Sequence, residues 1–173
     1  MSWHTSALLI KADFSKNHFN LFKMLGLNGG EASEIVSFDD ASSGSNDGLA
    51  LGSVAGWTAL WGALEMVWLI DDRRLDKLAK KADIFWMILE GTSDTAGFTW
   101  WTGGKKVRDW MSQAGEVIKN EGKALPEEKK AFAKKDEEQG VLQMLMSLTL
   151  PLKSLEAIQY QMYEFPEDAV FDE

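Results

Sequence analysis

Cysteine is missing from this chain of 173 residues, and histidine is nearly so, with only His4 and His18. Without cysteine the chain has no disulfide framework, no thiol nucleophile and no cysteine-ligated zinc. The sequence also lacks the His-Glu-x-x-His and EF-hand spacings, a nucleophile elbow and a phosphate-binding glycine-rich loop. We therefore predict no metal site, no cofactor and no catalytic residues.

Positive charge is missing from two stretches. Residues 24–72 contain eight acids and no Lys or Arg, and residues 164–173 contain five acids and no base, in a chain of net charge −9. An acidic surface repels phosphate backbones, so we predict no nucleic-acid partner. The acids either keep the protein soluble or attract a basic protein partner. The candidate residues for such a surface are Glu31, Glu34, Asp39, Asp40 and Asp47.

A targeting or membrane segment is also not evident. Residues 1–4 carry no basic run, and the apolar residues 7–10 are too few for a signal-peptide core. Residues 48–70 hold a single charge, Glu65, over a length that could cross a bilayer. Polar residues and glycines interrupt this segment, so we predict buried strands, no membrane partner and a cytoplasmic protein.

Residues 97–110 predict a β-hairpin. Strand-favouring residues flank Gly103-Gly104, and two glycines readily adopt the positive φ angles of a two-residue turn. The predicted pairs are Thr102 with Lys105, Trp101 with Lys106, and Trp100 with Val107. One face would carry Phe98, Trp100 and Val107, and the other Trp101, Lys106, Arg108 and Trp110. Arg108 either binds a carboxylate or phosphate ligand or, as we favour, is a stacked structural arginine.

Large aromatic side chains are abundant, with eight tryptophans and nine phenylalanines. Most of them are expected in the core. The alternative is an aromatic pocket for a small ligand, for which the candidate residues are Trp57, Trp61, Trp100 and Trp101.

The order of the predicted elements indicates the α+β class, with residues 1–173 forming a single domain. We predict a mainly antiparallel sheet with a Trp-rich meander, and helices near residues 15–25, 73–82 and 137–150 that pack on one face. Asp136 is the predicted cap of the last helix, with Gln139 as its partner. Residues 155–165 are expected to pass from a short helix into a strand. Residues 166–173 are expected to form a mobile acidic tail.

Residues 56–132 resemble small uncharacterised bacterial α+β proteins, some of which are immunity-like. The resemblance rests on an aromatic strand, a Gly-Lys turn, Val107-Arg108, and then Gly122-Lys-Ala-Leu-Pro-Glu-Glu. It implies a cytoplasmic, non-catalytic interaction protein of the immunity or inhibitor type, and it supplies no catalytic residues. The competing hypothesis is a small-molecule-binding protein or enzyme that uses the aromatic pocket.

Overall fold

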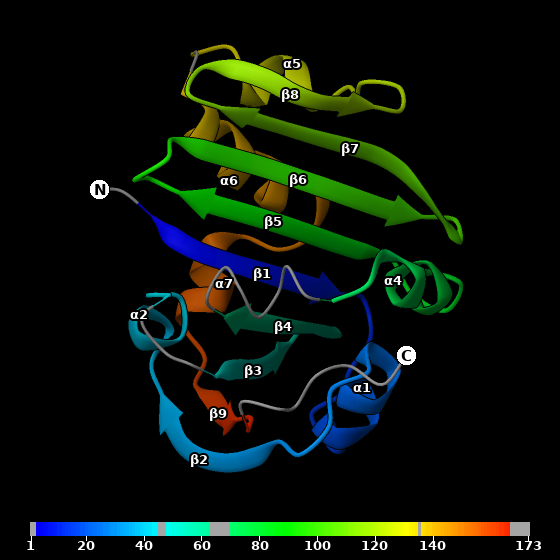
Figure 1. Cartoon of the computed structure of the whole chain (residues 1–173), viewed down its shortest axis with the longest axis vertical. Coiled ribbons are helices and arrows are strands. Elements are labelled where there is room, and N and C mark those ends of the chain that lie inside the picture. Colours follow the sequence, from blue (N-terminus) through cyan, green and yellow to red (C-terminus); the bar gives the residue numbers. More distant parts are fainter. Residues whose placement is uncertain (1–2, 45–47, 63–69, 135, 167–173) are drawn as a thin grey trace.

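The computed structural model describes residues 3–44, 48–62, 70–134 and 136–166 (Figure 1). The strands are β1 (His4–Ile10), β2 (Glu31–Val36), β3 (Leu49–Val54), β4 (Trp57–Gly62), β5 (Ile84–Glu90), β6 (Thr95–Thr102), β7 (Lys105–Gln113), β8 (Glu116–Glu121) and β9 (Tyr160–Glu164). The helices are α1 (His18–Leu25), α2 (Phe38–Ala41), α4 (Asp72–Ala79), α5 (Glu128–Ala131), α6 (Glu137–Leu148) and α7 (Leu152–Glu156).

One nine-stranded sheet organises these elements in the order β2-β9-β3-β4-β1-β5-β6-β7-β8. Every pairing between neighbours is antiparallel. The predicted mixed α and β content with a mainly antiparallel sheet is therefore confirmed. Strands β5 to β8 lie side by side in chain order, whereas β1 sits in the centre between β4 and β5 (Figure 1).

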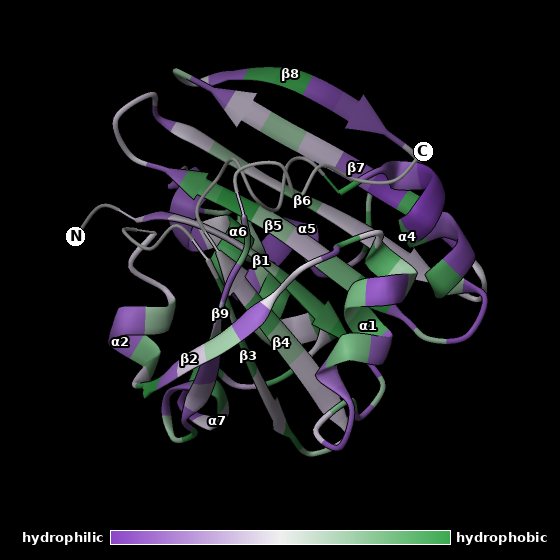
Figure 2. Ribbon diagram, turned by 60° about the horizontal axis from the view of Figure 1, so that its bottom comes forward, coloured by the Kyte–Doolittle hydropathy of each residue, from purple (hydrophilic) through white to green (hydrophobic). Residues whose placement is uncertain are grey.

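Both faces of the central strands are buried and lined by helices, whereas the edge strands β2 and β8 are largely exposed. On β1, Ala7 and Leu9 join one hydrophobic cluster with α6, while Leu8 and Ile10 join a second cluster with α1 and α4. We call these the α6 face and the α1 face. The central strands β1 and β5 are correspondingly dominated by hydrophobic residues (Figure 2).

The expectation that helices pack on one face is thus not met. Helix α6 contacts β5 and β6 from one side, and the buried residues of α1 and α4 belong to the cluster of the other side. The physical reason lies in the strands. A strand buried on both faces is a continuous apolar run, as in Ala7-Leu-Leu-Ile, and such a run requires cover on both sides.

A β-bulge corrects the predicted hairpin faces. Gly103 and Gly104 have φ of 61° and 84°, as the predicted turn requires, and Trp101 pairs with Lys106. The register then shifts, so that Trp100 pairs with Arg108 rather than with Val107. The extra residue re-aims the strand beyond it. Arg108 and Trp110 therefore belong to the α6 face and not to the face of Trp101.

Other local predictions agree with the structure. The Asp136 side chain accepts a hydrogen bond of 3.1 Å from the backbone N–H of Gln139 at the start of α6. Residues 152–164 pass from α7 into β9. The predicted buried strands within residues 48–62 are β3 and β4, while Glu65 lies outside the described residues. None of the described helices has the length and apolar composition needed to cross a membrane.

Candidate functional site

The acids predicted from the sequence do not converge on a site. Glu31 and Glu34 lie on the edge strand β2, and Asp39 and Asp40 lie in the short helix α2; all four are exposed. Asp47 lies outside the described residues. The carboxylates lie on a strand and a helix that follow one another at the β2 edge of the sheet (Figure 1). We call these four residues the β2-edge acids.

The predicted tryptophan pocket is divided by the sheet. Trp57, Trp61 and Trp100 are buried in the cluster of the α6 face, whereas Trp101 is buried in the cluster of the α1 face. Trp101 donates its Nε1–H to Asp76 Oδ1 at 2.8 Å, and the Nζ of Lys106 lies 5.5 Å from its ring centroid. The four indoles therefore serve two separate cores and do not line a common pocket.

A groove of about 1170 Å³ opens at the opposite edge of the sheet from β2, among β7, α5 and the start of α6. The turns β5–β6 and β7–β8 also contribute to its lining, through Asp94 and Gly115. Its lining residues are Asp94, Trp110, Gly115, Ala124, Leu125, Pro126, Glu128, Lys129, Phe132, Asp136, Glu137 and Glu138. We call it the acidic groove.

Aromatic rings form the apolar part of this groove. The Trp110 and Phe132 ring centroids lie 4.6 Å apart, and both rings pack on Phe98, at 6.2 and 6.4 Å. The bulge brings Trp110 to this face. Gly140 admits Phe132, because a Cβ at position 140 would lie 2.3 Å from the Phe132 Cδ1 atom. The sequence therefore builds the aromatic floor from two backbone features.

Negative charge dominates the rest of the lining. Asp94, Asp136, Glu137 and Glu138 face one basic lining residue, Lys129. Burial raises the pKa of Glu138, and the negative charges of Asp136 and Asp94 raise it further. A hydrogen bond of 3.4 Å from the Trp3 backbone N–H to Glu138 Oε2 opposes this shift. The carboxylates thus repel one another, and a bound cation would relieve that repulsion.

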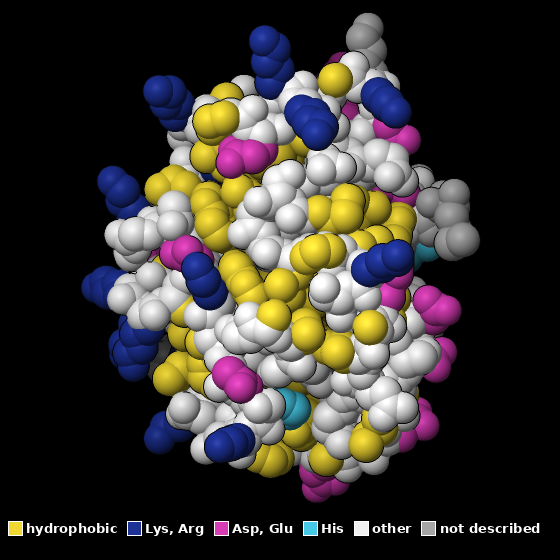
Figure 3. All heavy atoms as spheres, turned by 180° about the vertical axis from the view of Figure 1, so that it is seen from behind, with side chains coloured by type: hydrophobic (Ala, Val, Ile, Leu, Met, Phe, Trp, Pro, Cys, Tyr) yellow, Lys and Arg dark blue, Asp and Glu magenta, His cyan; other side chains and the backbone are white. Residues whose placement is uncertain are grey.

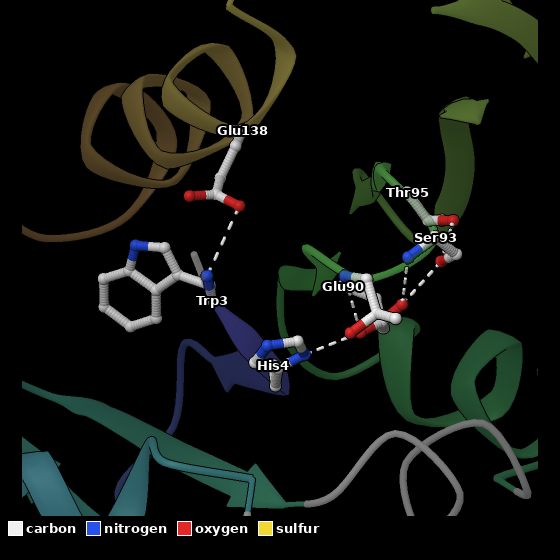
Figure 4. Close-up of polar contacts among 7 residues, drawn as sticks. Trp3, His4, Glu90, Ser93, Thr95 and Glu138 are labelled. Atoms are coloured by element: carbon white, nitrogen blue, oxygen red, sulfur yellow. Dashed lines mark hydrogen bonds and ion pairs between the residues drawn. The ribbon is translucent and has the colours of Figure 1, made fainter. Parts of the chain in front are cut away.

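His4, the residue next to Trp3, contacts the carboxylate of Glu90 (Figure 4). The pKa of Glu90 is lowered, whereas that of Glu138 is raised. Glu90 accepts hydrogen bonds from the Ser93 hydroxyl and backbone N–H at 2.6 and 2.7 Å, and from the Thr92 N–H at 3.1 Å. These bonds, with a contact of 2.6 Å to His4 Nδ1, lower the pKa of Glu90 to about 2. The Ser93 hydroxyl bonds to Glu90 and Thr95, with no bond to the imidazole (Figure 4). The cluster therefore stabilises the β5–β6 turn and is not a nucleophile–base pair.

A buried ion pair holds the wall of the groove. Arg108 is 3% exposed, and its Nε and Nη2 donate to the two carboxylate oxygens of Glu128 at 2.9 and 2.8 Å. Its Nη1 donates to Asn120 Oδ1 and to the carbonyls of Glu121 and Gly122. Glu128 in turn accepts the Leu125 backbone N–H. Arg108 is thus structural and ties β8 and α5 to β7, but its partner is a carboxylate and not a stacked indole.

Reasoning from the sequence missed the groove acids. The only signal for them was the helix cap at Asp136, which concerns local structure and not a site. In the described part of the chain, no group of three or more His, Asp or Glu side chains is arranged to hold a metal ion.

Comparison with known proteins gives no relative for this chain: no family model matches it, and neither a curated protein nor a solved structure is detectably similar to it.

Proposed function

We propose that this protein is a non-catalytic, cytoplasmic interaction module, of the immunity or inhibitor type, whose acidic groove binds a basic segment of a partner protein. The single observation that carries the proposal is the acidic groove itself, whose lining combines four acids with a pair of aromatic rings in contact. The proposed interaction surface is therefore the acidic groove, and not the β2-edge acids that the sequence predicted.

The chemistry of the lining fits a lysine or arginine side chain. An ammonium or guanidinium over an indole or phenyl ring gains about 0.5–2 kcal/mol, and carboxylates at the rim steer a cation toward it. Trp110 and Phe132 offer the rings, and Asp94 with the α6 acids offers the charge. A small monovalent ion would not need the aromatic floor, whereas a basic peptide uses both parts of the groove.

Titration of a fluorescein-labelled peptide of alternating lysine and alanine tests the proposal by fluorescence anisotropy. The groove variant is Asp136→Asn/Glu137→Gln/Glu138→Gln, which keeps a competent helix cap because Asn caps as well as Asp. We expect it to weaken binding at least about tenfold, which corresponds to about 1.4 kcal/mol. The affinity of the wild type should fall with added salt, since the screening length is about 10 Å at 0.1 M.

The control variant removes the same charge at the β2 edge, through Glu34→Gln/Asp39→Asn/Asp40→Asn. It should change the affinity less than about twofold, because a peptide bound in the acidic groove does not contact the β2-edge acids. Equal losses in the two variants would mean that net charge alone attracts the peptide, and the proposal would then be abandoned. An unchanged groove variant would have the same consequence.

The aromatic half of the groove is tested separately with Phe132→Leu, which keeps an apolar side chain but removes the ring. A cation held over the rings predicts a loss of affinity of about 0.5–1 kcal/mol. A small-molecule function remains the second candidate, and one feature favours it. A cavity of about 220 Å³ beside Trp101 is lined by Trp86, Thr99 and Asp109 among others.

A further inference from the structure

A second charged groove, of opposite sign, lies between α1 and α4. It has a volume of about 360 Å³ and is lined by Asn20, Lys23, Met24, Arg74, Lys77, Leu78 and Lys81. No carboxylate is among these lining residues. Basic side chains gather along the corresponding side of the molecule, at the left of Figure 3, and acidic side chains gather along the other. We call this the basic groove.

The carboxylates of α4 and its cap are engaged elsewhere. Asp71 pairs with Arg73 at 2.8 Å, and Asp72 pairs with Lys106 at 2.7 Å. Asp76 accepts the indole N–H of Trp101. The acids that could neutralise the groove lysines within the same helix therefore already have other partners.

The layout of the groove favours an extended ligand over a compact phosphate. Arg74, Lys77 and Lys81 follow a spacing of three and four residues, so the row runs about 10 Å along the helix direction. Lys23 and Lys77 lie in the last turns of α1 and α4, where free backbone N–H groups for a phosphate are absent. Met24 and the buried Leu78 add an apolar strip. Spaced anions with one apolar side chain match this surface.

The chain carries a segment of this chemistry. Residues 167–173, Glu-Asp-Ala-Val-Phe-Asp-Glu, contain four acids, no base and Phe171, and they lie outside the described residues. The described chain leads to α1 just before them. Phe165 packs edge-on against Phe22 of α1 at 5.2 Å, and Pro166 approaches Gly29, shortly after that helix.

The distance to the groove is within reach of this segment. Helices α1 and α4 are in contact, and a Cβ at Gly26, which ends α1, would lie 2.5 Å from the Arg74 guanidinium carbon. Seven extended residues span up to about 25 Å. We propose that the basic groove binds residues 167–173 of the same molecule, with their carboxylates on the lysines and Phe171 on the Met24–Leu78 strip.

Paramagnetic broadening in NMR spectra of the full chain tests the proposal. The chain has no cysteine, so Ala169→Cys gives a single attachment site for a spin label. We expect the amide signals of Lys23, Lys77 and Lys81 to lose most of their intensity at low salt. The triple substitution Lys23→Gln/Lys77→Gln/Lys81→Gln should remove the broadening, which is compared between variants through the amide signals of Met24 and Leu78. The matched Lys123→Gln/Lys130→Gln/Lys134→Gln variant should leave these two signals broadened.

Two outcomes would overturn the proposal. The first is the absence of broadening at the groove in low salt, or equal broadening in the two triple variants. The second concerns the source of the segment. If isotope-labelled protein without the spin label is broadened when mixed with spin-labelled, isotope-free protein, the segment binds a second copy, and the same-molecule contact is wrong. Folding of each variant is checked by its dispersed amide spectrum, and the acidic groove is unaltered throughout.

Discussion

The two acidic regions of this protein contain the same residue types but differ in surroundings. The β2-edge acids are exposed on a strand and a short helix. In the acidic groove, Asp94 and Asp136 are exposed too, but Glu137 and Glu138 are partly buried beside the aromatic floor, and burial raises the pKa of Glu138. A carboxylate surrounded by water is already well solvated and gains little from a partner, whereas desolvated carboxylates near one another gain from a cation. Burial, rather than the number of acids, distinguishes the partly buried Glu138 from the β2-edge acids.

The largest expected effect is on the wall of the acidic groove. Arg108→Ala leaves Glu128 charged, buried and without its main partner, and should lower the free energy of unfolding by about 3–5 kcal/mol. Urea denaturation measures this change. The control Arg73→Ala removes a highly exposed guanidinium that pairs with Asp71, and should cost less than about 0.5 kcal/mol. If Arg108→Ala were as mild as its control, the ion pair would not hold the groove.

The next effect distinguishes two leucines of α6, the helix that begins at the groove. Leu145 is fully buried on the α6 face, and Leu145→Ala should cost about 2–5 kcal/mol. Leu148 is only half-buried near the end of the helix, so Leu148→Ala should cost clearly less. Thermal or urea unfolding of both variants checks the order. Equal losses would contradict the described burial of this helix.

Valine substitutions in two glycine-containing turns should destabilise the fold equally but should differ in their effect on binding of the basic peptide. Gly115 lines the acidic groove at φ 79°, and Gly103 forms the β6–β7 turn, outside the groove lining, at φ 61°. Open space surrounds both Cβ positions, so valine at either should cost about 1–2 kcal/mol from backbone strain alone. Only Gly115→Val should also weaken binding of the basic peptide. Equal affinities for the two variants would exclude Gly115 from the binding surface.

The smallest effects concern pH, and they have opposite signs for Glu138 and Glu90. The raised pKa of Glu138 means that the folded state binds this proton more tightly than the unfolded state does. Protonated Glu138 therefore favours the folded state, and this contribution is lost as pH rises above about 4.5. The lowered pKa of Glu90 gives stability that is lost as pH falls from about 4.5 to about 2. Near neutral pH, Glu138→Gln should therefore stabilise slightly and Glu90→Gln should destabilise.

Both differences should shrink in acid. Near pH 3, Glu138 is protonated in the folded and the unfolded state, whereas Glu90 becomes protonated in the unfolded state although its lowered pKa keeps it ionised in the folded state. Urea denaturation of each variant and of the wild type, at neutral pH and near pH 3, provides the comparison. For Glu138 the gain should remain below about 0.5 kcal/mol, because its side chain is only partly buried. A destabilised Glu138→Gln at neutral pH would show that the bond to the Trp3 N–H outweighs the repulsion.

Predictions from the sequence succeeded where neighbours in the chain decide the conformation. Gly103-Gly104 adopts the positive φ angles of a tight turn, and Asp136 caps α6 through Gln139. They failed where one residue changed a register. The residue pairs next to the turn follow from counting outward from Gly103-Gly104. The bulge opposite Trp100 has no signal in the local sequence, and it places Arg108 and Trp110 on the opposite face from the predicted one.

The amino-acid sequence by itself determined the mixed α and β content with a mainly antiparallel sheet, the turns and helix caps, and the exclusion of thiol and disulfide chemistry. These follow from backbone preferences and from hydrogen bonds between residues a few positions apart. Only the tertiary structure decided that helices cover both faces, that the tryptophans divide between two cores, and that Asp94 joins Asp136 and Glu138 around Trp110 and Phe132. Strand pairing and burial join residues far apart in the chain, and the electrostatics of a carboxylate depend on that burial.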